Sequence, residues 1–118
     1  MSFKRGDVLI ALVPHADVSG SKPRPVVVVQ ADAYNAKIAN LVVAAVTSNL
    51  TFAADAASLL IDVSTAEGRA TGLRHNSVVS CINLATIDQA VVARKIGSLG
   101  VTLMQYLNRC LKTALDLP

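Results

Sequence analysis

The chain has 118 residues, of which 53% are hydrophobic and 16% charged, so it can bury a core, and we expect residues 1–118 to form one domain. Aromatic residues make up only 3%, which argues against a nucleic-acid module that stacks several bases on exposed rings. The formal net charge of +3 permits an anionic partner that is held by charge and hydrogen bonds.

The first half of the chain alternates strand signals with turn signals. Residues 8–13 are a short apolar run that ends at Pro14 and predict a buried strand. A loop follows at 15–23, because serine, glycine and proline gather there. Four consecutive valines predict a strand within 25–30. We then expect a short helix within 31–40 and a strand at 41–46.

The second half predicts further strands and one clear helix. Strands are expected at 59–63 and 77–82, with a turn at 67–72, whereas 87–96 is compatible with either strand or helix. Near the C-terminus apolar residues recur at helical spacing, and Ser98 is a candidate N-cap. These positions are Leu103, Met104, Leu107, Cys110, Leu111, Ala114 and Leu115. The pattern predicts an α+β fold: a small, mostly antiparallel sheet or half-barrel with a C-terminal amphipathic helix packed against it.

Cysteine spacing and hydropathy bear on the compartment. Cys81 and Cys110 lie far apart and form no CxxC pair, so neither a disulfide framework nor a zinc site is indicated. Asp7 interrupts the basic-to-apolar transition that a signal peptide needs, and no apolar stretch is long enough to span a membrane. We therefore expect a cytoplasmic protein with no membrane partner, no metal and no cofactor.

Several short motifs occur in a fixed order along nearly the whole chain. They are Arg5-Gly6-Asp7-Val8, Lys22-Pro23-Arg24-Pro25, Val46-Thr47-Ser48-Asn49, Thr71-Gly72-Leu73, Ser77-Val78-Val79, Thr86-Ile87-Asp88 and Lys95-Ile96-Gly97-Ser98-Leu99. In order and spacing this set resembles the MazF/PemK toxins. The resemblance implies an SH3-like half-barrel of the CcdB/MazF type, a homodimer, and ribosome-independent, metal-independent cleavage of single-stranded mRNA. It also implies a cognate antitoxin whose flexible acidic segment covers the RNA groove.

The resemblance carries two catalytic residues over to this chain, Arg24 and Thr47. RNA cleavage without a metal can use the 2′-hydroxyl as nucleophile, which leaves a cyclic phosphate and a 5′-hydroxyl, and the site must stabilise the charge that develops on the phosphate. A guanidinium suits that task, and a threonine hydroxyl can orient the phosphate or the 2′-hydroxyl.

The general base is less clearly indicated. Some relatives use a basic and an acidic residue that align with Ser80 and Ile82, whose side chains cannot replace them. His15, in the loop before Arg24, is the candidate base, because imidazole titrates near physiological pH. His75 is interpreted as a surface residue. Ala85 stands where relatives usually have a basic residue, a change that bears on activity or RNA specificity.

RNA contacts are assigned to polar residues in the predicted loops and strand ends: Lys22, Arg24, Ser48, Asn49, Arg69 and Arg74. The ordinary explanation for each is a solvated loop residue.

Two alternative functions stay open at this point. One is a gyrase-binding toxin of the CcdB type. Toxins of that type place a Trp-Gly-Ile ending at their target, whereas this chain has no Trp, which disfavours this alternative. The other is a catalytically weakened toxin-like domain that acts by binding its antitoxin or RNA.

Overall fold

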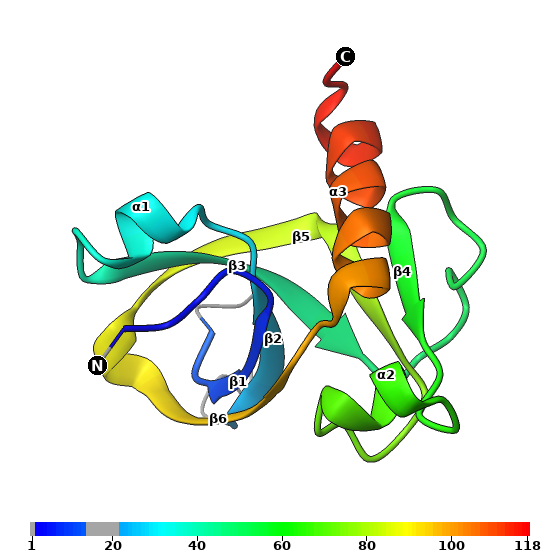
Figure 1. Cartoon of the computed structure of the whole chain (residues 1–118), viewed down its shortest axis with the longest axis horizontal. Coiled ribbons are helices and arrows are strands. Elements are labelled where there is room, and N and C mark those ends of the chain that lie inside the picture. Colours follow the sequence, from blue (N-terminus) through cyan, green and yellow to red (C-terminus); the bar gives the residue numbers. More distant parts are fainter. Residues whose placement is uncertain (1, 14–21) are drawn as a thin grey trace.

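A six-stranded antiparallel sheet dominates the structure, a computed structural model that describes residues 2–13 and 22–118 (Figure 1). The sheet order is β4-β5-β3-β2-β1-β6, and each neighbouring pair is antiparallel. The strands are β1 (Asp7–Ala11), β2 (Arg24–Val28), β3 (Asn40–Thr47), β4 (Ser58–Ile61), β5 (Ser77–Asp88) and β6 (Val92–Ser98). The predicted α+β class with a mostly antiparallel sheet is confirmed.

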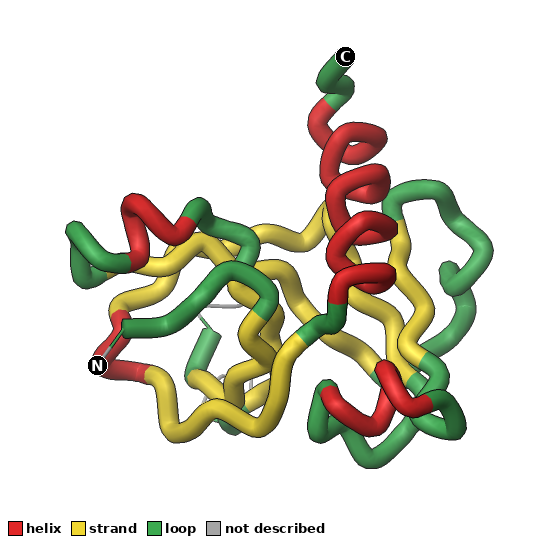
Figure 2. The backbone as a smooth tube through the Cα atoms, viewed as in Figure 1, coloured by secondary structure: helices red, strands yellow, loops and turns green. Residues whose placement is uncertain are grey.

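Among the described residues, three helices accompany the sheet (Figure 2). The short helix α1 (Asp32–Asn35) joins β2 to β3, and α2 (Ala66–Ala70) follows β4. The long helix α3 (Val101–Leu115) packs across β5 and β4, as Figure 1 shows. A 3-10 turn (Gln89–Val91) separates β5 from β6.

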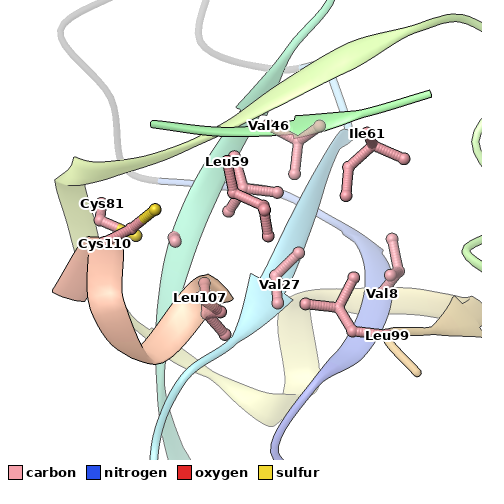
Figure 3. Close-up of a cluster of buried hydrophobic side chains, with 11 residues drawn as sticks. Val8, Val27, Val46, Leu59, Ile61, Cys81, Leu99, Leu107 and Cys110 are labelled. Carbon is pink, nitrogen blue, oxygen red and sulfur yellow. The ribbon is translucent and has the colours of Figure 1, made fainter. Parts of the chain in front are cut away.

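The apolar face of α3 closes the larger of two core clusters. Leu107 and Cys110 enter from α3 and meet side chains from the sheet, among them Val27, Leu59 and Cys81 (Figure 3). The predicted amphipathic helix and its core role are thus confirmed, although Leu115 is 51% exposed. Burial raises the pKa of the Cys81 thiol to about 12, and this thiol hydrogen-bonds to that of Cys110. Both cysteines are free and buried.

A second cluster fills the other side of the sheet. It contains Phe3 from the N-terminal segment and inward-facing residues of β1, β2, β3 and β5, including Leu9, Val26, Leu41 and Ile87. Strands β1 and β2 place alternate residues in the two clusters, since successive side chains of a strand point to opposite faces. The valine strand is therefore buried on both faces, which explains its continuous apolar sequence.

Three sequence predictions are wrong in detail. The expected turn at 67–72 is mostly the helix α2, which Thr65 caps by accepting the N–H of Gly68 at 2.9 Å. The segment 87–96 is neither one strand nor one helix but the end of β5, the 3-10 turn and β6. Ser98 is the last residue of β6 and does not cap α3, whose N-cap is Gly100. There the carboxylate of Glu67 accepts the N–H of Leu103 at 3.4 Å.

Strand β5 continues past the predicted end at residue 82 and contains an irregularity. Ala44 of β3 pairs with Leu84 and Ala45 pairs with Ser80, so the three residues 81–83 of β5 are extra relative to β3. Such an insertion bends a strand and redirects its side chains. The Asn83 amide donates to the Ser80 hydroxyl at 2.8 Å across this bulge.

Candidate active site

Antiparallel pairing brings the two predicted catalytic residues to the same end of the sheet. Val26 of β2 pairs with Ala45 of β3. Arg24 is the first residue of β2 and Thr47 the last residue of β3, each two positions beyond this pair. Because β5 runs antiparallel to β3, the beginning of β5 lies at this end as well, with Val78 opposite Thr47.

A groove of about 780 Å³ opens at this end of the sheet. Strand side chains such as Ile10, Val26 and Ala45 line it together with polar residues from the strand ends and the connecting segments. The cationic, imidazole-bearing and hydroxyl-bearing lining residues are Lys22, Arg24, Thr47, Ser48, Arg74, His75, Ser77, Ser80 and Arg94. We refer to this feature as the basic groove, because no Asp or Glu of the described residues lines it.

Arg24 has an extended backbone and lines the basic groove. It lies between Pro23 and Pro25, and a residue before proline is restricted to the extended region. Ala11 of β1 is its cross-strand partner. The side chain is exposed. Its guanidinium is therefore hydrated, and an anionic ligand can reach it from solvent.

Thr47 joins the sheet to a turn that also organises Ser48 and Asn49. The Thr47 hydroxyl accepts the N–H of Asn49 at 3.1 Å. Asn49 in turn accepts both the N–H and the hydroxyl of Thr51, at 3.0 and 2.6 Å. Ser48 lines the basic groove, whereas Asn49 does not, because its side chain is engaged in the turn.

The segment before β5 brings Arg74 and His75 into the basic groove. Gly72 has a φ of +76°, and a Cβ built there would lie 2.1 Å from the carbonyl oxygen of Ile96, so the chain passes β6 at a distance that only glycine permits. The Ser77 hydroxyl donates to the carbonyl of His75 at 2.7 Å. Asn76 accepts the N–H of Val63 at 2.9 Å. The backbone at His75 and the residue that follows it are therefore held by side-chain hydrogen bonds.

The other predicted site residues are distributed unevenly. Lys22 lines the basic groove, whereas Arg69 does not: its guanidinium donates to the carbonyl of Ser64 at 2.7 Å, within the turn that begins α2. His15 lies outside the described residues. Of the predicted RNA contacts, the structure thus brings together Lys22, Arg24, Ser48 and Arg74 and leaves Asn49 and Arg69 apart.

The three positions that depart from the family pattern have different surroundings. Ser80 lines the basic groove. Ile82, in the bulge, is 70% exposed and does not line the groove. Ala85 packs against the second core cluster. The bulge therefore separates Ser80 from Ile82, two positions that the sequence places only two residues apart.

Two charged or titratable groove residues were not assigned to the site from sequence. His75 lies in a segment whose sequence resembles an ordinary turn, which predicts a surface residue. Arg94 belongs to the segment 87–96, whose sequence is compatible with both strand and helix, so the sequence assigns Arg94 to no face. The sequence feature that indicates this residue is the period-two spacing of Arg94 and Ile96, which places both side chains on one face of a strand; both line the groove. Arg94 is also the β6 partner of Ile10, another lining residue.

The described part of the chain contains neither a cluster of metal-ligating side chains nor a membrane-spanning helix. No group of three or more His, Cys, Asp or Glu side chains is arranged to hold a metal ion among residues 2–13 and 22–118. Over the same residues, no helix combines the length and apolar character needed to cross a membrane.

Comparison with known proteins identifies the family. Residues 4–115 match the family described as PemK-like, MazF-like toxin of type II toxin-antitoxin system. The chain is 34% identical over 103 residues to endoribonuclease MazF6 of Mycobacterium tuberculosis, an alignment that covers 84% of this chain and 86% of that protein. Endoribonuclease MazF2 of Mycobacterium bovis matches to the same extent.

Solved structures agree with this assignment. The Mycobacterium tuberculosis toxin MazF-mt6 is 27% identical with a TM-score of 0.76, covering 95% of this chain and 98% of that one. An endoribonuclease in complex with its cognate antitoxin from Mycobacterial species shares the fold, with a TM-score of 0.80, 21% identity and coverage of 99% and 98%. The chain therefore belongs to the PemK-like, MazF-like toxins of type II toxin-antitoxin systems, in which its curated relatives are endoribonucleases.

Proposed function

We propose that this endoribonuclease toxin binds single-stranded mRNA in the basic groove and cleaves it, without a metal or the ribosome, by attack of the 2′-hydroxyl on the adjacent phosphate. One observation carries the proposal: Arg24 and Thr47, far apart in sequence, line the same groove at one end of the sheet. Lys22, Arg74 and Arg94 add positive charge there. A groove lined by cations and hydroxyls suits a polyanion.

Arg24 is assigned the stabilisation of the transition state. As the O2′–P bond forms and the P–O5′ bond breaks, negative charge grows on the non-bridging phosphate oxygens. A guanidinium donates several hydrogen bonds in a fixed plane and stays charged at every relevant pH, so it can hold two of these oxygens at once. Arg24 is exposed and lines the basic groove, where a phosphate of the RNA backbone can approach it.

Thr47 is assigned the orientation of the reacting groups. Its oxygen already accepts the Asn49 N–H, which leaves the hydroxyl hydrogen available to donate to a phosphate oxygen. A donor held by the end of a strand loses little freedom when RNA binds, and such preorganisation lowers the barrier to reaction.

Substrate selection in this groove relies on charge and hydrogen bonds. No Phe, Tyr or Trp of the described residues lines it, so aromatic stacking on several bases is not the means of recognition. Ser48, Ser80 and Asn83 offer hydroxyl and amide groups to base edges or the 2′-hydroxyl. Ser80 and Asn83, which are hydrogen-bonded to each other across the bulge of β5, are the residues we assign to base selection.

The family and the basic groove support our assignments of partners and compartment. We assign the toxin a cognate antitoxin with a flexible acidic segment, since such a segment is complementary to the basic groove and would exclude RNA. Cleavage that continues unchanged at saturating antitoxin would contradict this.

We also assign a homodimer, for which Phe52 and Ile82, each 70% exposed, supply apolar surface. The cytoplasm, where mRNA is found, is the compartment we assign.

The experiment uses the purified full chain and a long single-stranded RNA in excess chelator. Wild type is expected to cut at defined sites and to leave 2′,3′-cyclic phosphate and 5′-hydroxyl ends, with cutting lost in Arg24→Ala and Thr47→Ala variants shown by circular dichroism to be folded. Lys112→Gln on α3 is the matched control for removal of an exposed charge. Cutting that requires added metal, or variants that cut like wild type, would contradict the mechanism. A wild type that cuts no RNA would favour the binding-only alternative.

A further inference from the structure

Transfer of a proton is the step for which neither Arg24 nor Thr47 is suited. The 2′-hydroxyl must lose its proton as the O2′–P bond forms, and the 5′-oxygen must gain one as the P–O5′ bond breaks. A side chain promotes this transfer when it can exist both protonated and unprotonated near the working pH. A guanidinium remains protonated, and an aliphatic hydroxyl is too weak an acid and too weak a base.

The basic groove offers few groups that titrate at all. Among its described lining residues the ionisable side chains are Lys22, Arg24, Arg74, His75 and Arg94. Four of these belong to residue types that are cationic at neutral pH, and no carboxylate, thiol or phenol of the described residues lines the groove. Histidine is the one type in the set that changes charge between about pH 5 and 8.

The position of His75 fits this role in three respects. It precedes β5 at the end of the sheet where Arg24 begins β2 and Thr47 ends β3, and all three line one groove. Its backbone is anchored by the hydrogen bond from the Ser77 hydroxyl. Its side chain is exposed, and among the described residues its imidazole has no hydrogen-bond partner, so the ring is available to a substrate.

We propose that His75 is the general base of the cleavage reaction; this inference rests on the proposed function. The neutral imidazole accepts the 2′-hydroxyl proton as that oxygen bonds to phosphorus. Water protonates the departing 5′-oxygen, and the imidazolium then gives its proton to the hydroxide so formed. Bonds and charge balance, and the products are a 2′,3′-cyclic phosphate and a 5′-hydroxyl. Arg24 stabilises the phosphate throughout.

The test is the pH dependence of single-turnover cleavage between pH 5 and 9, in chelator, with wild type, His75→Asn and His15→Asn. Wild type is expected to show a rising limb in the range where imidazoles titrate. His75→Asn should lower the rate about 10²- to 10⁴-fold and abolish that limb, because asparagine keeps the polarity but cannot accept a proton. Affinity for an RNA with a 2′-deoxy group at the cleavage site should change less than about threefold, because the base acts on the chemical step. Free imidazole should partly restore His75→Ala.

Each remaining outcome overturns the proposal in a recognisable way. A limb that survives in His75→Asn but disappears in His15→Asn assigns the base to His15. A slower His75→Asn enzyme with an unchanged pH profile makes His75 a positioning residue. Lys37→Gln replaces an exposed residue near α1 that does not line the groove, and it is the control for a substitution outside the site. This variant should cleave RNA at the wild-type rate. Wild type without cleavage at any pH would overturn the proposed function itself, whereas cleavage that needs Arg24 but not His75 would overturn this inference alone.

Discussion

Arg24 and Thr47 stand two residues beyond the Val26–Ala45 pair, on neighbouring strands that run in opposite directions. The register of β2 against β3 therefore decides whether the guanidinium and the hydroxyl share one groove. A slip by one residue would turn either side chain to the other face of the sheet. The valines of β2, buried on both faces, hold this register by packing.

Replacing Arg24 by lysine should separate charge from geometry. Lysine retains the positive charge but loses the planar arrangement of donors, so we expect cleavage to fall at least about tenfold in Arg24→Lys and about 10²- to 10³-fold or more in Arg24→Ala. The measurement is single-turnover cleavage of a fixed RNA. Equal rates for the lysine variant and wild type would show that charge alone suffices.

The hydroxyl of Thr47 can be removed at nearly constant volume. Thr47→Val should reduce cleavage about 10²- to 10³-fold, as expected for loss of one transition-state donor. Thr47→Ser keeps the oxygen that accepts the Asn49 N–H and should stay within about tenfold of wild type. The two variants should melt at similar temperatures because the residue is exposed. A valine variant as active as the serine variant would remove Thr47 from the site.

Leu107 and Leu115 on α3 form a matched pair for stability. Leu107 is fully buried in the larger core cluster, so Leu107→Ala should lower the free energy of unfolding by about 2–5 kcal/mol. Leu115 is 51% exposed, and Leu115→Ala should cost less than about 1 kcal/mol. Chemical denaturation checks both. Similar losses would mean that α3 does not close the core as described.

Gly72, which lines the groove, and Gly100, which does not, form a second matched pair of variants. A methyl group at Gly72 would meet the Ile96 carbonyl on a φ of +76°, whereas at Gly100 the nearest atom, 2.5 Å away, belongs to the flexible carboxylate of Glu67. Gly72→Ala should therefore cost more than about 1–2 kcal/mol of stability and reduce cleavage, because Arg74 and His75 follow directly. Gly100→Ala should cost less. The reverse order would contradict the close passage against β6.

Cys81 should make stability fall at alkaline pH. Burial raises the pKa of its thiol from 9.0 to about 12 in the folded chain, so between these values the unfolded chain has lost a proton that the folded chain keeps. Stability from this group is complete below about pH 9 and declines as the pH rises towards 12. Denaturation curves should show a steeper decline from pH 9 to 10.5 for wild type than for Cys81→Ala. Equal slopes would contradict the assignment.

Local patterns predicted much of the fold, but not its details. The valines of β2 and the apolar spacing of α3 each repeat over several residues, and such signals survive in the folded chain. Helix α2 and the break between β5 and β6 escaped prediction because each depends on one short cap, at Thr65 and Asp88. The bulge at 81–83 leaves no periodic signal at all.

The motifs around Arg24 and Thr47, and with them the family, are properties of the sequence itself, because order and spacing along the chain suffice to recognise them. Which side chains share the basic groove was decided only by tertiary structure. Strand pairing brings Arg94 and His75 beside residues distant in sequence, and the turn hydrogen bonds of Asn49 and Arg69 draw those side chains away. A groove is a property of several segments at once, and no single segment encodes which of its neighbours will line it.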